Sequence, residues 1–158
     1  MALPLQCRVA TPDDLGELTN LFDLYRQFYQ CTPDPRAAFN WLRENLKGQR
    51  STIFVADLQG RIAGFTQLYP ALCSVELAPY FVLYDLFVEQ SFRRQGVARA
   101  LMNHAAQWAT AAGASRLDLE TAHDNIDAQA LYTSLGYERD NVFLKYSLAL
   151  AAPAQGAA

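Results

Sequence analysis

A continuous run from residue 80 to residue 137 limits the folds that are open to this chain. It begins with an apolar segment, Phe81–Val88, passes through a basic turn that holds a glycine, and enters an alanine-rich segment, Val97–Ala112. The first segment has the aromatic and β-branched content of a strand, and the second has strong helix propensity. A strand that turns through glycine into a helix indicates an α/β protein with a ligand site at the turn.

The turn itself has the features that a phosphate group requires. Gly96 has no Cβ, so the backbone can come close to a ligand. The amides that open the following helix have no partner within it and carry the positive end of its dipole. An ordinary strand-to-helix connection with solvated arginines is the alternative interpretation. The residues expected to hold a pyrophosphate are Arg93, Arg94, Gln95, Gly96, Val97, Ala98 and Arg99.

The remaining pattern predicts a mixed sheet flanked by helices. A helix between residues 81–88 and 116–121 makes those two strands parallel if the crossover is right-handed. Gln59-Gly60 predicts an antiparallel hairpin, and residues 71–79 fit either a loop or the start of a strand. The strands are expected at residues 3–9, 51–58, 61–69, 81–88, 116–121 and 142–148, and the helices at 11–29, 36–47, 97–112 and 126–135.

Length, composition and charge restrict the functional class. The chain has 158 residues, 51% of them hydrophobic, which is enough for one domain with its own core. A net charge of −3 argues against a nucleic-acid partner, and no His or Cys spacing predicts a metal site. No apolar run is long enough to span a membrane. We expect a cytoplasmic protein with one domain at residues 1–148 and a flexible tail at 149–158.

Two blocks of the sequence resemble the GNAT superfamily of N-acetyltransferases, which use acetyl-coenzyme A. The turn Arg93–Ala98 is similar to the family pattern Q/R-x-x-G-x-G/A, with Ala98 where glycine is common. The second block follows about thirty residues later, in the family's order. It consists of Asn125, Ala128, Leu131-Tyr132 and Gly136-Tyr137. The resemblance covers about residues 5–147.

The resemblance implies a GNAT-like fold in which the two parallel strands splay apart and the pantetheine arm of coenzyme A pairs with the exposed strand. Phe87 and Val88 are then expected along the arm. The Leu86 N–H is expected to face the thioester oxygen and stabilise its developing charge. Tyr132 is expected to donate a proton to the departing thiolate, with packing against a neighbouring helix as the alternative. Asn125, Ala128 and Leu131 are expected beside the cofactor.

A carboxylate must take a proton from the acceptor, because an alkyl ammonium group titrates near pH 10. Asp85 is the first candidate, since an acid inside an apolar strand is costly without a partner; a purely structural carboxylate is the alternative. Glu120 and Glu76 are the second and third candidates. The residues expected around the substrate are Tyr84, Glu76, Glu120 and Tyr29.

The expected activity is transfer of an acetyl group from acetyl-coenzyme A to a primary amine of a small molecule, by direct attack. Residues 84–88 resemble the corresponding strand of the diamine and polyamine acetyltransferases, so a polyamine or amino compound is expected as acceptor. The alternatives are acetylation of protein lysines or N-termini, transfer of another acyl group, and a non-catalytic coenzyme-A-binding regulatory module. A homodimer that covers the apolar segment 142–148 is also expected.

Overall fold

The computed structural model describes residues 5–151, which fall into two compact units, Met1–His123 and Asp124–Ala158. The first unit contains a five-stranded sheet in which the strands follow one another in chain order. Its first four strands are antiparallel neighbours, and the last pair is parallel. The predicted mixed sheet is therefore confirmed. The strands are β1 (Leu5–Val9), β2 (Thr52–Leu58), β3 (Arg61–Cys73), β4 (Ala78–Val88) and β5 (Leu117–Asp118).

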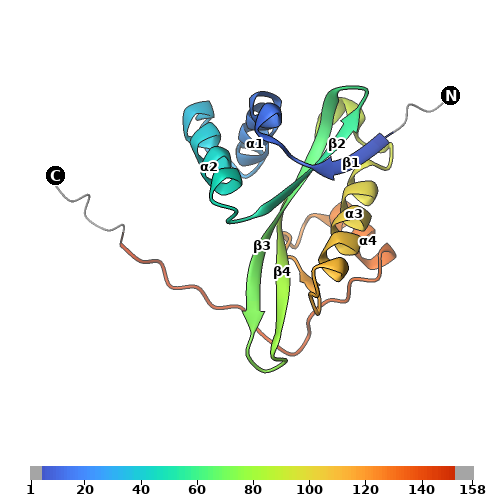
Figure 1. The fold of residues 1–158 in the computed structure, drawn as a ribbon. Coiled ribbons are helices and arrows are strands. Elements are labelled where there is room, and N and C mark those ends of the chain that lie inside the picture. Colours follow the sequence, from blue (N-terminus) through green and yellow to red (C-terminus); the bar gives the residue numbers. More distant parts are fainter. Residues whose placement is uncertain (1–4, 152–158) are drawn as a thin grey trace. The chain divides into compact units, whose positions relative to one another are not determined.

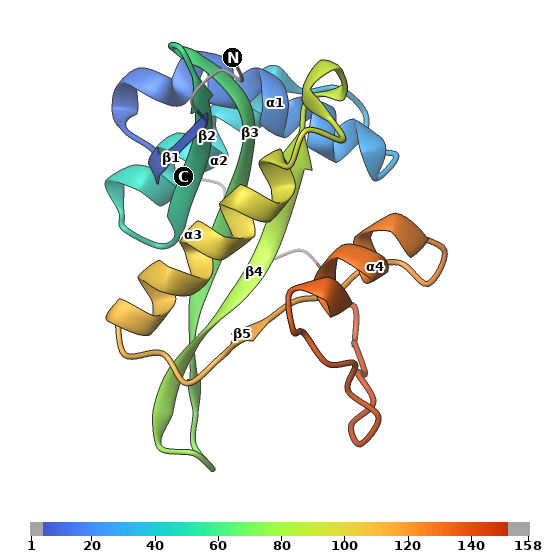
Figure 2. The ribbon, with the colours of Figure 1, turned by 90° about the vertical axis from the view of Figure 1, so that its right-hand side faces the viewer.

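Helices cover both faces of this sheet. The helices α1 (Leu15–Phe28) and α2 (Pro35–Lys47) lie on one face, and α3 (Val97–Ala111) lies on the other (Figure 1, Figure 2). Neighbouring side chains of the strands point to opposite layers, as the strand repeat requires. Phe65 of β3 contacts aromatic rings of α1, whereas Phe54 of β2 contacts Trp108 of α3. The sheet thus separates two apolar layers.

One arginine joins three elements at the edge of the sheet. Arg8 of β1 donates two hydrogen bonds to the Asp14 carboxylate, at 2.8 and 2.9 Å, just before α1 begins. It donates a third, at 3.0 Å, to Asp57 of β2. The hydrogen bonds from Arg8 hold the pKa of Asp14 below its usual value, against the opposing effect of burial.

A β-bulge interrupts β4. Gln67 of β3 pairs with Asp85, but the next residue, Leu68, pairs with Leu83. Tyr84 is therefore one residue more than the partner strand can match. Side chains of a regular strand alternate between faces, so an extra residue exchanges the faces of everything that follows it.

The contacts of β4 show this exchange. Phe81 and Asp85 are four residues apart and would share one face of a regular strand. The Phe81 ring instead packs on Trp108 of α3, 5.0 Å between centroids, while Asp85 interacts with Tyr25 of α1 on the other face. The bulge thus turns a carboxylate toward α1 and α2.

Strand β5 is shorter than residues 116–121, which were predicted. It pairs with β4 only at Phe81 and Val82. Residues 71–79, which the sequence left ambiguous, form the ends of β3 and β4 and the turn between them. Beyond Val82 the two parallel strands are no longer paired, as the expected splay requires.

The second unit contains α4 (Ile126–Ser134). The Asn125 side chain caps this helix by accepting the Ala128 N–H at 3.3 Å. The strand predicted at residues 142–148 was wrong, because these residues form neither helix nor strand. Their apolar content suits a strand, but a strand also needs a paired neighbour, and strand propensity depends on that context. None of the described helices is long and apolar enough to cross a bilayer.

Candidate active site

The outer edge of β4 presents main-chain groups after the bulge. The Phe81 N–H donates to a carbonyl just before β5, whereas the Glu89 N–H donates to a carbonyl of β3. In a regular strand these two odd-numbered residues would point to the same side. Counting back from Glu89 places the N–H and C=O groups of Val88 and Leu86 on the side away from β3. An extended ligand could pair with these groups as an added strand.

The turn after β4 forms an open cradle. Gly96 precedes α3 with φ 81°, a left-handed conformation that favours glycine. No atom of the described residues, its chain neighbours aside, lies within 4 Å of the position that a Cβ would occupy there. The first bond of the helix runs from the Ala100 N–H to the Gly96 carbonyl at 3.0 Å, so the helix ladder does not use the amides of Val97 and Ala98.

The turn has left-handed backbone at two residues, and Arg93 ties it to the end of β4. Arg94 and Gly96 both adopt left-handed backbone, so the turn changes direction twice within three residues. Such turns aim successive amides toward one point. The Arg93 Nε donates to the Val88 carbonyl at 3.0 Å, and its guanidinium lies 5.5 Å from the centroid of the Phe87 ring. Arg93 therefore holds the end of β4, and the Val88 oxygen keeps a second lone pair for another donor.

The face of β4 that carries Asp85 borders a cavity of about 370 Å³, which lies between the sheet and the helices α1 and α2. Tyr84 and Asp85, the two residues at the bulge, both reach it. Trp41 and Tyr84 are 48% and 67% exposed and form its mouth, while Asp85 is 4% exposed and lies at its base. The lining residues are Phe22, Arg26, Ala37, Ala38, Trp41, Tyr69, Tyr84 and Asp85.

Asp85 is a buried acid whose hydrogen-bond donors are uncharged side chains. Burial is the main effect on its pKa and raises it, while hydrogen bonds from the Gln67 amide and the Tyr25 hydroxyl oppose the rise. The Tyr25 hydroxyl has one proton to donate, and its other acceptor within reach is the main-chain oxygen of Tyr84 at 3.3 Å. Burial raises the pKa of Tyr25, and the nearby Asp85 raises it further, so the phenol stays protonated. The site therefore combines a carboxylate of raised basicity with a fixed hydrogen-bond donor.

A buried chain of hydrogen bonds orients Gln67. Its amide oxygen accepts from Ser51 at 2.6 Å and from Asn45 at 3.1 Å, which turns its amide nitrogen toward Asp85. Asn45 also donates to the Tyr69 hydroxyl at 3.2 Å. The sequence analysis missed Gln67 and Asn45 as parts of the site. The signal that could have found Gln67 is a polar side chain within a long apolar strand, which needs a buried partner.

Neither of the other two candidate acids is a lining residue of the cavity at Asp85. Glu76 lies in the turn between β3 and β4, where it accepts from Ser115 at 3.0 Å and from Arg116 at 2.6 Å. Glu120 follows β5 in a segment without helix or strand. Tyr29 follows the last residue of α1 and contacts the Tyr25 ring edge-on at 5.2 Å.

The predicted residues of the second unit form their own group around α4. The rings of Tyr132 and Tyr137 lie 6.0 Å apart. Burial raises the pKa of Tyr137 to about 12. Ala128 and Leu131 are half-buried residues of the same helix, and Ala128 meets the Asn125 cap. Their expected roles beside the cofactor stay predictions.

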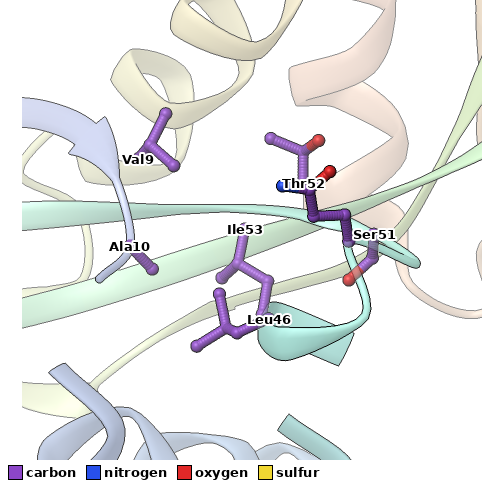
Figure 3. A pocket seen from close by; sticks show the side chains of 7 residues that line it. Val9, Ala10, Leu46, Ser51, Thr52 and Ile53 are labelled. Atoms are coloured by element: carbon purple, nitrogen blue, oxygen red, sulfur yellow. The ribbon is translucent and has the colours of Figure 1, made fainter. Parts of the chain in front are cut away.

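A second cavity, of about 420 Å³, lies where β1, β2 and the end of α2 meet (Figure 3). Its described lining is apolar or neutral and contains no ionisable side chain. It therefore offers no acid or base for proton transfer, in contrast to the cavity at Asp85. The lining residues are Val9, Ala10, Leu46, Gln49, Ser51, Thr52 and Ile53.

Comparisons with known proteins agree with this geometry. The sequence profile of the acetyltransferase (GNAT) family matches residues 17–137. An uncharacterized N-acetyltransferase of Bacillus subtilis, YhfO, is 37% identical over 144 residues, which cover 91% of this chain and 97% of the relative. These matches span the bulge, the cradle and α4 in one continuous stretch.

Solved structures give the same result at the level of the fold. A crystal structure of a probable acetyltransferase has a TM-score of 0.87 and 35% identity, covering 94% of this chain and 99% of the other. An aminoglycoside N-acetyltransferase in complex with coenzyme A has a TM-score of 0.79 at 21% identity, covering 95% and 98%. Acetyltransferases of this family use acetyl-coenzyme A as their acetyl donor.

Proposed function

The chain belongs to the GNAT family of acetyltransferases, and on this premise we propose that it acetylates a primary amine of a small molecule, a polyamine or an amino compound. One observation carries the proposal. At its bulge, the single strand β4 points a buried carboxylate toward a cavity on one face of the sheet. After the bulge, the same strand directs main-chain amides toward its open edge. A donor on the edge and an acceptor in the cavity would meet at that bulge.

The described residues fit coenzyme A. Gly96 leaves open space where a side chain would stand, so a pyrophosphate can approach the amides at the start of α3. Leu86 and Val88 supply the main-chain groups for the pantetheine arm. When bound, acetyl-coenzyme A supplies an acetyl thioester, whose carbonyl carbon accepts the amine lone pair as the C–S bond breaks. The Leu86 N–H can donate to the thioester oxygen as its charge grows.

Asp85 prepares the acceptor in this proposal. Its carboxylate takes a proton from the ammonium group and leaves a nitrogen with a free lone pair. Burial raises the pKa of Asp85 and so makes it a stronger base than an exposed aspartate. The Gln67 amide holds the carboxylate in place during this transfer.

Tyr132 is our proposed proton donor to the thiolate. The support is the match of Asn125, Ala128, Leu131-Tyr132 and Gly136-Tyr137 to the family pattern, together with the profile that extends to residue 137. A phenol has an ordinary pKa near 10 and can protonate or hydrogen-bond a sulfur anion. Tyr132→Phe should therefore slow turnover without weakening coenzyme A binding.

Two measurements test the proposed function. Titration calorimetry should detect binding of acetyl-coenzyme A, and failure to bind at millimolar concentration would reject the proposal. A panel of primary amines should then cause release of free thiol, followed with a thiol-reactive dye. Binding without thiol release from any amine of a broad panel would instead favour a coenzyme-A-binding regulatory module.

We also propose a homodimer. Five apolar side chains within residues 142–148 are between 79% and 88% exposed, and such a patch usually has a partner. They are Val142, Phe143, Leu144, Tyr146 and Leu148. Light scattering after size-exclusion chromatography should give twice the 17.6 kDa chain mass. A single-chain mass at tens of micromolar protein would count against the dimer.

The last proposals concern the domain, the compartment and the C-terminal tail. We propose that residues 1–148 act as one acetyltransferase domain and that the protein works in the cytoplasm. The flexible tail predicted at 149–158 falls mostly outside the described residues. Limited proteolysis should remove the tail first and leave acetyl-coenzyme A binding intact.

A further inference from the structure

The acceptor cavity contains one positive and one negative side chain. Among its eight described lining residues, Asp85 is the one acidic residue and Arg26 is the one positively charged residue. The others are apolar or aromatic. A ligand that matched this lining would itself carry one charge of each sign, separated by an apolar chain. Charge matching of this kind sets binding preference more than contact area does.

The guanidinium of Arg26 has donors to offer a ligand. Its NH1 donates to Asp23 at 3.2 Å, which uses one of the five N–H groups of an arginine. The buried Asp23 carboxylate also accepts from the Gln27 amide at 3.0 Å and from the Asp34 N–H at 2.9 Å. Asp23 thus fixes the arginine at the cavity wall without depending on it.

We propose that the acceptor is an amino carboxylate, whose amine lies at Asp85 and whose carboxylate pairs with Arg26. An arginine fork matches a carboxylate in geometry and can make two parallel hydrogen bonds to it. Trp41 and Tyr84 flank the carbon chain between the two charges. A diamine fits less well, because its second ammonium would face the guanidinium, while the Asp23 carboxylate that pairs with Arg26 is buried and already accepts from three donors.

This inference rests on the proposed function and selects among its acceptors. Three compounds separate the possibilities, since they share a carbon chain and differ only at the far end: 4-aminobutanoate, n-butylamine and 1,4-diaminobutane. We expect kcat/KM to be about ten- to a hundred-fold higher for the amino carboxylate than for either other amine, the range of one charge-assisted contact. The same order should hold for the series with two more carbons.

Variants of Arg26 test the assignment. Arg26→Gln should lower the ratio of kcat/KM for 4-aminobutanoate over n-butylamine at least tenfold, and Arg26→Lys should restore part of it. Arg26→Glu should shift the preference toward 1,4-diaminobutane. Arg43→Gln is the matched control, because Arg43 pairs with the exposed Glu44 at 3.4 Å and is not a lining residue. It should keep the wild-type ratio.

Calorimetry in the presence of coenzyme A distinguishes the two ways of failing. If 4-aminobutanoate and its longer homologue bind no more tightly than the matching alkylamines, the inference is wrong, whatever the turnover. If they bind more tightly but release no thiol, the inference stands and the proposed catalysis fails. An unchanged ratio in a folded Arg26→Gln variant would also overturn the assignment. Because the wild-type series is decisive alone, a variant that does not fold leaves the test intact.

Discussion

A matched pair of glycine substitutions at the two ends of α3 tests the phosphate cradle. Gly96 and Gly113 have nearly the same left-handed φ, 81° and 79°, and open space at the Cβ position. An alanine in this conformation costs about 1–2 kcal/mol. Each substitution should therefore lower the free energy of unfolding by that amount and the melting temperature by about 2–8 °C. Urea unfolding and thermal melts should give similar losses for both variants.

The two variants should differ in coenzyme A binding. Gly96→Ala puts a methyl group where the proposed pyrophosphate approaches the amides of α3, whereas Gly113→Ala lies at the other end of that helix. We expect the Kd for coenzyme A to rise at least about tenfold, or 1.4 kcal/mol, only in Gly96→Ala. Calorimetry well below either melting temperature measures this. Equal affinity in Gly96→Ala and wild type would refute the cradle, and equal losses in both variants would show that the effect comes from strain.

Four other substitutions test the base, the sheet and the first helix. Asp85→Asn should lower kcat/KM by about 10²–10⁴-fold with unchanged coenzyme A affinity. In the wild type, kcat/KM should fall on the acidic side of its pH profile at a pH above about 3.9, because burial raises the pKa of Asp85. This acidic fall should be absent from the variant. Arg8→Gln should lower the free energy of unfolding, measured in urea at pH 7, by about 1–3 kcal/mol. Because Arg8 depresses the pKa of Asp14 in the folded protein, this loss of stability should shrink as the pH falls from about 3.9 through that pKa. Gly64→Ala brings a Cβ to 2.7 Å from a β4 oxygen and should destabilise by about 1–3 kcal/mol, whereas Gly16→Ala, in open space, should stabilise by up to about 1 kcal/mol in thermal melts.

The sequence predicts best where structure is encoded locally. Local sequence alone predicts the conformation of the apolar run at 81–88, the glycine at 96 and the alanine-rich helix. The structure has β4, the turn and α3 at these positions. The Gln59-Gly60 turn likewise predicts the β2–β3 hairpin, with left-handed φ at both residues. Such signals depend on neighbours within a few residues, so no knowledge of the tertiary fold is needed to interpret them.

Features that depend on pairing are not visible in the same way. The bulge at Tyr84 exists because β3 and β4 differ by one residue between two pairings, and nothing in β4 alone marks it. Gln67 was hidden for the same reason, since its partner Asp85 follows eighteen residues later. Residues 142–148 show the opposite error: an apolar segment without a neighbouring strand to pair with is not a strand.

The bulge connects the two halves of the proposed chemistry. If Tyr84 had a partner in β3, Asp85 would share the face of Phe81 and point toward α3, away from the acceptor cavity. The same regular pairing would turn the amides of Leu86 and Val88 toward β3, where they would hydrogen-bond to that strand and be closed to a ligand. One inserted residue therefore sets both the side chain that takes the proton and the main chain that faces the donor. A chain with this pattern cannot move its base to the other face and keep its binding edge, so the position of the base and the orientation of the binding edge depend on the same bulge.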